Sequence, residues 1–227
     1  MRLLNVFTYR LESYPDAFEA PQYAILSHTW GNEEVLFDDV NAKGGEEQNW
    51  TGRGSAKKIL MSVEQARKDR LRYIWIDNIC IDKSSSAELS EAINSMFNWY
   101  KMSRICYAYL SDVQNIEDLD HCKWLSRGWT LQELIAPDHV EFYGACWSYI
   151  GSRESLANEL GALTNINKEL LSRRDQHTVT VEQDLASISI ATKMSWARDR
   201  KTTRREDIAY CLMGIFNVNM PLLYGGR

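Results

Sequence analysis

The sequence is poor in residues that interrupt or cross-link a polypeptide. Of its 227 residues only 4 are proline and 12 are glycine, whereas 44% are apolar and 25% are charged. This composition excludes disordered, collagen-like and low-complexity chains, and the length suffices for one large domain with a substantial core. The five cysteines are odd in number and form no C-x-x-C pair, which argues against a disulfide framework and a zinc site.

The sequence also has no long apolar segment and no signal-peptide pattern. No apolar run approaches the roughly 20 residues that cross a bilayer, and Met1 to Asn5 lead directly into mixed sequence. We therefore expect a reduced, soluble, cytoplasmic protein without membrane contact. The four histidines show no metal-ligand spacing, so no metal is predicted.

The charge balance disfavours a nucleic-acid partner. Acidic residues number 31 against 26 basic ones, for a formal net charge of −5, whereas a chain that coats nucleic acid carries excess positive charge. One basic run contains Arg198, Arg200, Lys201, Arg204 and Arg205. We interpret this run as a solvated turn between helices, with phosphate binding as the alternative. Gly52-Arg53-Gly54-Ser55 is interpreted as a flexible loop, with anion binding at a helix N-terminus as the alternative.

Short apolar runs alternate with amphipathic segments in the first two thirds of the chain. Strands are predicted at residues 23–27, 73–77 (continued by Asn78-Ile79-Cys80-Ile81), 105–110 and 140–143. Helices are predicted at 57–71, 85–100 and 128–136, and the second of them opens with the capping box Ser85-Ser86-Ala87-Glu88. The near-continuous apolarity of the second run is typical of a strand covered on both faces. Strands that alternate with helices predict an α/β fold with an open, mainly parallel sheet flanked by helices.

After Gly151 the pattern is helical. Helices are predicted at residues 155–171 and 182–198, and the capping box Thr203-Arg204-Arg205-Glu206 predicts another. We therefore expect residues 1–227 to form a single domain. Its sheet would lie within about residues 20–150, and the extra C-terminal helices, over about 151–227, would pack on the sheet.

Polar side chains follow three of the predicted strands. Ser27, His28 and Trp30 follow the first, Asp77 and Asn78 the second, and residues 111–112 the third. Open α/β sheets bind ligands at the carboxyl ends of their strands, so the joint pattern indicates a site. Taken singly, each residue is better explained as a cap or turn. Ser27 and His28 are adjacent and point to opposite sides of a strand, which argues against a serine nucleophile activated by that histidine.

A short helix after the third strand carries an unusual pair. Trp129 and Glu133 lie one turn apart, on the face opposite Leu131, Leu134 and Ile135. An indole and a carboxylate in this arrangement can form one wall of a pocket. The alternative is a surface tryptophan covered by another segment, with Glu133 paired to a neighbouring basic side chain, Arg127 or Lys123.

Three sequence blocks occur in the order of a known family. They are YAILSHTWG (23–31), IWIDNICID (74–82) and RGWTLQEL (127–134), with further likeness in Met194-Ser195-Trp196-Ala197, Thr203, residues 206–210 and Leu223-Tyr224-Gly225. Together they resemble the fungal heterokaryon incompatibility (HET) domain over nearly the whole chain. The sequence departs from that pattern at Asp82-Lys83, where many relatives carry an amide side chain.

The resemblance implies a fold and a function. HET domains are similar to TIR domains, which have a flavodoxin-like sheet, and the family is linked with programmed cell death, an innate-immunity response, when genetically unlike fungal cells fuse. Several TIR domains cleave NAD with a glutamate that follows a tryptophan by one turn on a short helix. The match implies Glu133 as the catalytic residue of an NAD hydrolase. It further implies substrate contacts from Trp129, Ser27, His28, Trp30, Asp77 and Asn78.

NAD would be the substrate, and no cofactor is implied. The resemblance also implies activation by self-association, and further domains in a longer protein. The alternative is a non-catalytic, TIR-like interaction module that triggers cell death by recruiting partners.

Overall fold

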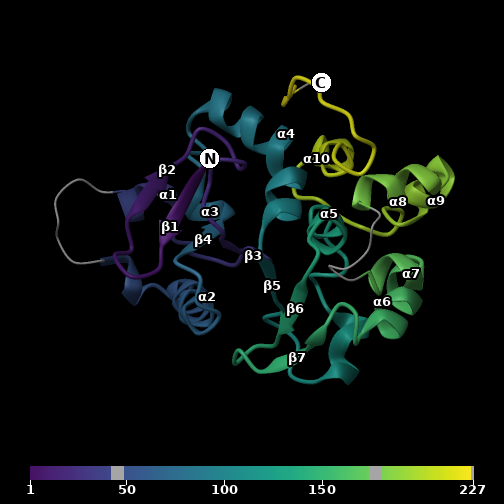
Figure 1. The fold of residues 1–227 in the computed structure, drawn as a ribbon, viewed down its shortest axis with the longest axis horizontal. Coiled ribbons are helices and arrows are strands. Elements are labelled where there is room, and N and C mark those ends of the chain that lie inside the picture. Colours follow the sequence, from purple (N-terminus) through teal and green to yellow (C-terminus); the bar gives the residue numbers. More distant parts are fainter. Residues whose placement is uncertain (42–48, 174–179, 226–227) are drawn as a thin grey trace.

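The computed structural model describes residues 1–41, 49–173 and 180–225. These residues contain a seven-stranded sheet with the order β2-β1-β4-β3-β5-β6-β7 (Figure 1). The central strands β4 (Tyr73–Ile76), β3 (Ala24–His28), β5 (Ile105–Tyr109) and β6 (Val140–Tyr143) are parallel. The antiparallel strands β1 (Arg2–Asn5), β2 (Leu11–Ser13) and β7 (Tyr149–Ser152) extend the two edges. The predicted open α/β sheet is confirmed.

Helices cover both faces of the sheet. Figure 1 shows α2 (Ala56–Lys68) on one face and α4 (Ser86–Met102) with α5 (Thr130–Ile135) on the other. Beside α5 lie α6 (Ala157–Thr164), α7 (Lys168–Leu171), α8 (Val181–Ser187), α9 (Ile190–Ser195) and α10 (Asp207–Tyr210). Shorter turns are α1 (Phe37–Asn41), η1 (Asn49–Gly52), α3 (Asp77–Cys80) and η2 (Ile116–His121). None of the described helices is long and apolar enough to span a bilayer.

The chain turns into a helix directly after β4, where the sequence suggests a longer strand. Residues 77–80 form α3, so the extension of the strand pattern through residues 78–81 is wrong. Asn78, Ile79 and Cys80 are all buried, so this single turn shows no amphipathic period by which the sequence could reveal it. As a result, Asp77 is the first residue of a helix that follows β4, and it is not part of the strand.

Of the two helix starts predicted from capping boxes, one is confirmed and one is wrong. Ser85 caps α4, because its hydroxyl accepts a hydrogen bond from the Glu88 amide as the sequence predicts. The second predicted capping box is wrong: α10 follows Glu206, which makes no side-chain cap, and Thr203 lies outside the helix. The predicted helix 155–171 is broken at Asn165, which has a left-handed φ of 58°. The predicted helix 182–198 is likewise divided, and Ser189 caps its second part.

The sequence patterns miss the antiparallel strands β1, β2 and β7. These strands have only three or four residues, which is too short to display an alternating period. β1 is nevertheless central to the core: Leu3 and Leu4 have no exposed surface and pack with the parallel strands. Pairing to β4 therefore decides the position of β1.

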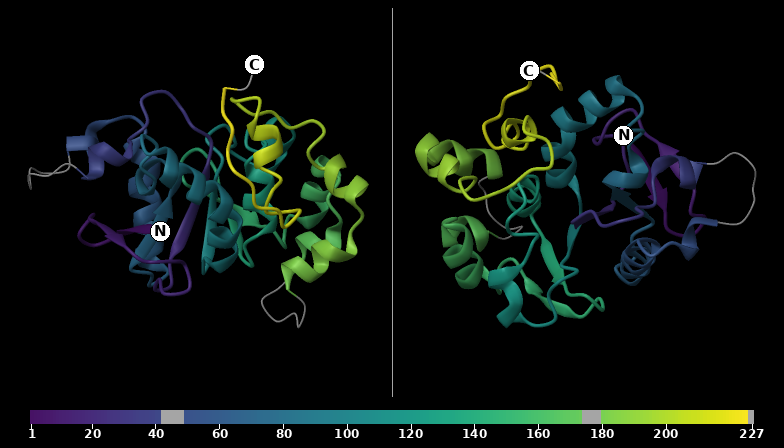
Figure 2. Two further views of the ribbon diagram at one scale, coloured as in Figure 1. Left: turned by 90° about the horizontal axis from the view of Figure 1, so that it is seen from above. Right: turned by 180° about the vertical axis from the view of Figure 1, so that it is seen from behind.

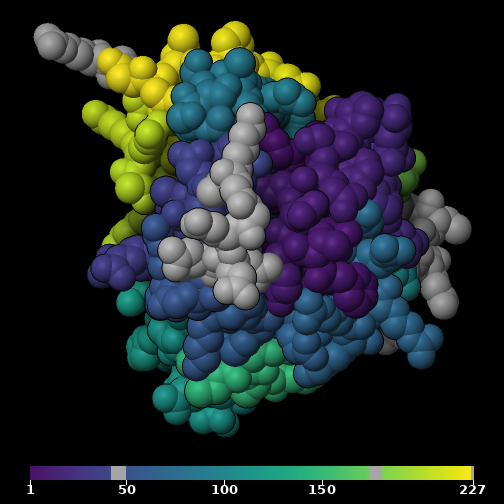
Figure 3. Space-filling view, turned by 90° about the vertical axis from the view of Figure 1, so that its left-hand side faces the viewer, coloured from purple at the N-terminus to yellow at the C-terminus, as the bar shows by residue number. Residues whose placement is uncertain are grey.

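The C-terminal third packs directly on the sheet. Leu160 and Leu185 belong to the same buried cluster as the strands. Asn94 on α4 bonds the backbone of Met220 through both its amide nitrogen and its oxygen, which fastens the C-terminal segment to α4. Figures 2 and 3 show this segment, in yellow, beside α4.

Arg153 joins the end of α5 to the extension. Its side chain is only 2% exposed, and its guanidinium donates to the carbonyls of Leu134, Pro137, Asp138 and Leu171. A buried arginine is tolerated because these carbonyls satisfy its donors. Arg153 thus fixes the carboxyl end of the helix that carries Glu133.

We predict that Arg153→Met lowers the free energy of unfolding by about 3 kcal/mol, because several charge-assisted hydrogen bonds are lost and four carbonyls, most of them buried, lose a donor. Urea unfolding followed by tryptophan fluorescence measures the change. Arg198→Met, at an exposed arginine, is the matched control and should change stability by less than about 0.5 kcal/mol. Equal effects of the two substitutions would contradict the role assigned to Arg153.

Candidate active site

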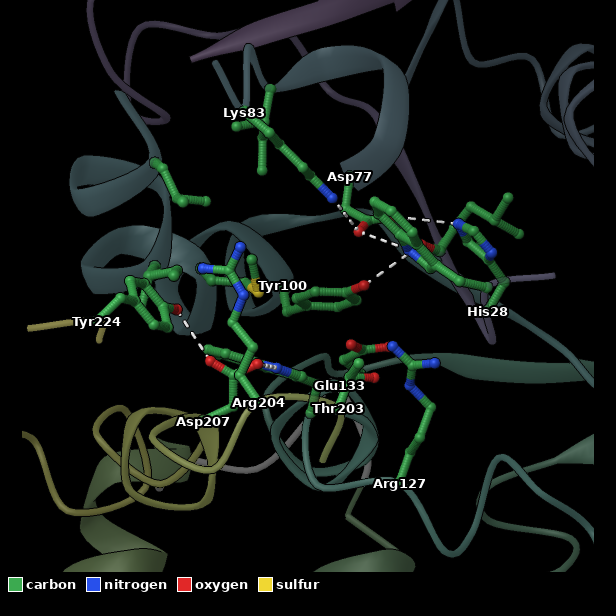
Figure 4. Close-up of a pocket in the computed structure, with 17 residues that line it drawn as sticks. His28, Asp77, Lys83, Tyr100, Arg127, Glu133, Thr203, Arg204, Asp207 and Tyr224 are labelled. Carbon is green, nitrogen blue, oxygen red and sulfur yellow. Dashed lines mark hydrogen bonds and ion pairs between the residues drawn. The ribbon is translucent and has the colours of Figure 1, made fainter. Parts of the chain in front are cut away.

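A cavity of about 280 Å³ opens at the carboxyl ends of β3 and β4 (Figure 4). Its polar walls come from the end of β3, the start of α3, α5 and the C-terminal segment. α4 contributes an apolar wall that includes Leu89, Ile93, Met96 and Tyr100. The cavity lies where the crossovers of an open α/β sheet diverge, which is the ordinary ligand site of this architecture.

Glu133 reaches this cavity from α5 and is only 7% exposed. The Ser27 hydroxyl donates to its carboxylate, and the Trp124 indole nitrogen donates to the Ser27 oxygen at 2.7 Å. An indole N–H can only donate, so Ser27 accepts from Trp124 and directs its own proton to Glu133. Burial raises the pKa of Glu133 to about 7, although the hydrogen bond from Ser27 opposes this shift. The carboxyl can therefore change its charge near neutral pH.

Asp77 lies across the cavity and has the opposite environment. Its carboxylate accepts hydrogen bonds from His28 Nε2 at 3.1 Å, Trp30 Nε1 at 3.0 Å and Lys83 Nζ at 3.1 Å. Burial opposes its ionisation, but Lys83 and His28 outweigh that effect and hold the pKa of Asp77 well below its usual range. Its negative charge in turn contributes to the raised pKa of Glu133.

Trp129 lines the cavity together with Glu133. Its indole nitrogen donates to Asp207 at 3.2 Å, and the Tyr224 hydroxyl donates to the same carboxylate at 2.9 Å. In the described part of the chain no ion pair joins Glu133 to Arg127 or Lys123, although Arg127 is near enough to favour the ionised carboxylate. The indole is thus held in place by its nitrogen while its ring faces the cavity.

The structure brings most of the predicted site residues to one cavity, but not all of them. His28, Trp30, Asp77, Trp129 and Glu133 line it. Ser27 has no exposed surface and lies behind Glu133, so the predicted substrate contact is replaced by a contact with the carboxylate. Ser27 and His28 do point to opposite sides, toward Glu133 and Asp77 respectively.

Asn78 is also displaced from its predicted role. It is 1% exposed and donates to Glu34 at 3.1 Å and to the Val35 carbonyl at 2.8 Å. Because Asn78 lies inside α3 and not on an extended strand, its side chain turns away from the cavity. It holds the segment that follows β3 and is not a ligand contact.

Two comparisons identify relatives of the chain. The family model "Heterokaryon incompatibility protein (HET)" matches residues 23–117. The "Vegetative incompatibility protein HET-E-1" of Podospora anserina is 44% identical over 218 residues, which is 90% of this chain and 15% of that protein. The chain contains a HET domain. No solved structure matches it.

The chain spans only part of this relative. HET-E-1 is far longer than this chain, which spans only 15% of its length. The family-model match ends before Trp129 and Glu133, whereas the likeness to HET-E-1 extends over nearly the whole chain. The similarity to TIR domains stays a prediction.

Several residues that line the cavity were not predicted as site residues from the sequence. Asp207 and Tyr224 come from the C-terminal segment, and Arg204 lies over the Tyr224 ring at 4.5 Å. All three residues fall in or near the C-terminal tail that resembles the family. That resemblance was the sequence signal from which they could have been identified as site residues. Lys83 stands where the sequence departs from the family pattern, and it supplies the cation that pairs with Asp77 and covers the Trp30 ring at 3.6 Å.

We predict that Glu133→Gln stabilises the HET domain at alkaline pH and has little effect at acid pH. The folded state raises the pKa of Glu133 from 4.5 to about 7. The wild type therefore loses stability as pH rises from about 5 through 7, whereas glutamine carries no charge to bury. The variant should gain about 2 kcal/mol over the wild type at pH 8.5 and almost nothing at pH 5.

Urea denaturation at a series of pH values measures this difference. Glu117→Gln, at an exposed glutamate, is the control and should show no pH-dependent gain. A constant difference between the Glu133→Gln variant and the wild type from pH 5 to 8.5 would show that folding does not shift the pKa of Glu133 in this range.

Proposed function

We propose that this HET domain is a cell-death effector of heterokaryon, or vegetative, incompatibility and that it hydrolyses the nicotinamide–ribose bond of NAD. The biological role rests on the likeness to HET-E-1, which is named for vegetative incompatibility. The chemistry rests on one observation: a carboxylate with a pKa near neutrality, Glu133, borders a cavity at the ligand-binding edge of the sheet.

One carboxylate is sufficient for this reaction. The nicotinamide of NAD is a cationic leaving group that departs neutral, so no general acid is required, in contrast to ordinary glycoside hydrolysis. Cleavage of the bond leaves positive charge on the ribose carbon and its ring oxygen. The Glu133 carboxylate stabilises that charge and accepts hydrogen bonds from the ribose hydroxyls. Water then adds to the carbon, and the products are nicotinamide, ADP-ribose and one proton.

The surroundings of Glu133 suit this role. The Trp124–Ser27 hydrogen-bond relay occupies one carboxylate oxygen and fixes the orientation of the group. A cation that develops in the cavity favours the ionised form of a carboxyl whose pKa is about 7. Trp129 offers a ring against which the nicotinamide ribose can stack. Asp77 is already bonded to three donors, so it holds His28, Trp30 and Lys83 in position.

We predict that the concentrated domain releases nicotinamide from NAD and that Glu133→Gln lowers the rate at least about a hundredfold. Chromatographic measurement of free nicotinamide gives the rate, with and without enforced oligomerisation through a fused dimerisation segment. Glu117→Gln keeps the wild-type rate. Nicotinamide release at an equal rate in the Glu133→Gln variant would remove this residue from the mechanism, and no release from any oligomeric form would refute the hydrolase.

A second candidate is a non-catalytic module that recruits partners. It is favoured by exposed apolar side chains of the C-terminal third, where Ile190, Met194, Ile208 and Leu223 are each at least half exposed. These residues supply a surface for another protein, and they do not contribute to the Glu133 cavity.

Expression in yeast separates the two candidates. We predict that the wild type kills cells and depletes NAD, and that Glu133→Gln abolishes both effects. The double variant Ile190→Ser/Met194→Ser, which alters only exposed side chains, retains NAD depletion. Undiminished death in the Glu133→Gln variant with intact NAD pools would instead favour recruitment.

A further inference from the structure

A second cavity, of about 510 Å³, adjoins the Glu133 cavity. It lies at the carboxyl ends of β3 and β5 and is bounded by the loop after β3, the start of α2, residues 123–127 and Lys201. Trp30 and Arg127 line both cavities. We refer to this second cavity as the basic cleft.

Positive charge dominates the basic cleft. Lys57, Lys123, Arg127 and Lys201 line it, and none of them forms an ion pair with a carboxylate of the described residues. Its lining contains one acidic residue, Glu34, whose carboxylate pairs with the buried Lys58. Four cations without a direct carboxylate partner, in a domain with net charge −5, form a local field that attracts anions.

The amino end of α2 faces the same cleft. Gly54 and Ser55 line it, and the Ser55 hydroxyl does not cap the helix, because it donates to the Glu33 carbonyl and accepts from the Val35 amide. The positive end of a 13-residue helix is therefore left without a side-chain cap beside the four cations. Lysine, arginine and free amides are the donors that hold phosphate oxygens in proteins.

Arg127 connects the basic cleft to the Glu133 cavity. A third hollow, of about 230 Å³, is lined by Arg127, Trp129, Lys201 and Asp207, so Arg127 borders three adjoining spaces. Figure 4 shows the Arg127 side chain beside Glu133. A ligand with its ribose at Glu133 can pass Arg127 and place a negatively charged group among the lysines.

We infer that the basic cleft binds the diphosphate of a dinucleotide whose nicotinamide ribose occupies the Glu133 cavity. This inference rests on the proposed function for the substrate and adds the site of its phosphates. Arg127 contacts the diphosphate at the junction, and Lys57, Lys123 and Lys201 surround its far side. Part of the ligand's affinity then comes from screened charge interactions, so binding weakens as salt rises.

Calorimetry with two probes tests the inference. Inorganic pyrophosphate reports on the cleft alone, and ADP-ribose reports on a ligand that spans both cavities. The double variant Lys57→Ala/Lys123→Ala, at two exposed lysines, should weaken the binding of both probes at least tenfold. Lys68→Ala/Lys168→Ala, which removes two exposed lysines outside the cleft, should leave both affinities within twofold of the wild type.

Three results would overturn the inference. Pyrophosphate that fails to bind, or binds equally to both double variants, removes the anion site. If the binding of pyrophosphate depends on Lys57 and Lys123 but the binding of ADP-ribose does not, the cleft binds an anion other than the diphosphate of the dinucleotide. Nicotinamide release by the same proteins is measured separately. If no nicotinamide is released but ADP-ribose binding depends on the two lysines, only the hydrolase is refuted. If nicotinamide is released normally but ADP-ribose binding does not depend on the lysines, only the phosphate site in the basic cleft is refuted.

Discussion

The site depends on one buried carboxylate, Glu133, and on the relay that holds it. The Trp124 indole orients the Ser27 hydroxyl, and that hydroxyl donates to the carboxylate. Burial raises the pKa of this carboxyl and the hydrogen bond from Ser27 opposes that shift, so the group changes between its neutral and charged forms near pH 7. Because Ser27 lies at the end of β3 and Glu133 on α5, this relay also fixes the distance between the sheet and the helix.

The two carboxyl groups of the cavity have different pKa values because their environments differ. Asp77 receives three donors, one of them the ammonium of Lys83, and stays ionised. Glu133 is buried and lies near the charged Asp77, so its pKa is raised although Ser27 donates a hydrogen bond to it. Pairs of acids whose pKa values are driven apart are typical of sites in which one group carries charge throughout and the other changes it.

The C-terminal segment completes the site. Asp207 and Tyr224 bond to each other, and Asp207 also holds the Trp129 indole, so the tail decides where that ring stands. Arg153 and Arg200 tie the extension to α5 from two directions, since Arg200 donates to the Arg127 carbonyl and to Thr130. Part of the basic run is thus structural. Arg200 is a tether rather than a solvated residue, whereas Arg204 and Lys201 face cavities.

The sequence alone determined the parallel strands, the capped start of α4 and the placement of Trp129 and Glu133 on a common face, because each of these follows from local periodicity and spacing. The tertiary structure decided which side chains meet across the sheet. Ser27 and Trp124 are 97 residues apart and Trp129 and Asp207 are 78 apart, and no local period encodes such a contact. The helical turn at Asp77 and the antiparallel strand β1 also required the tertiary structure, since packing from several directions stabilises them where intrinsic preference is weak.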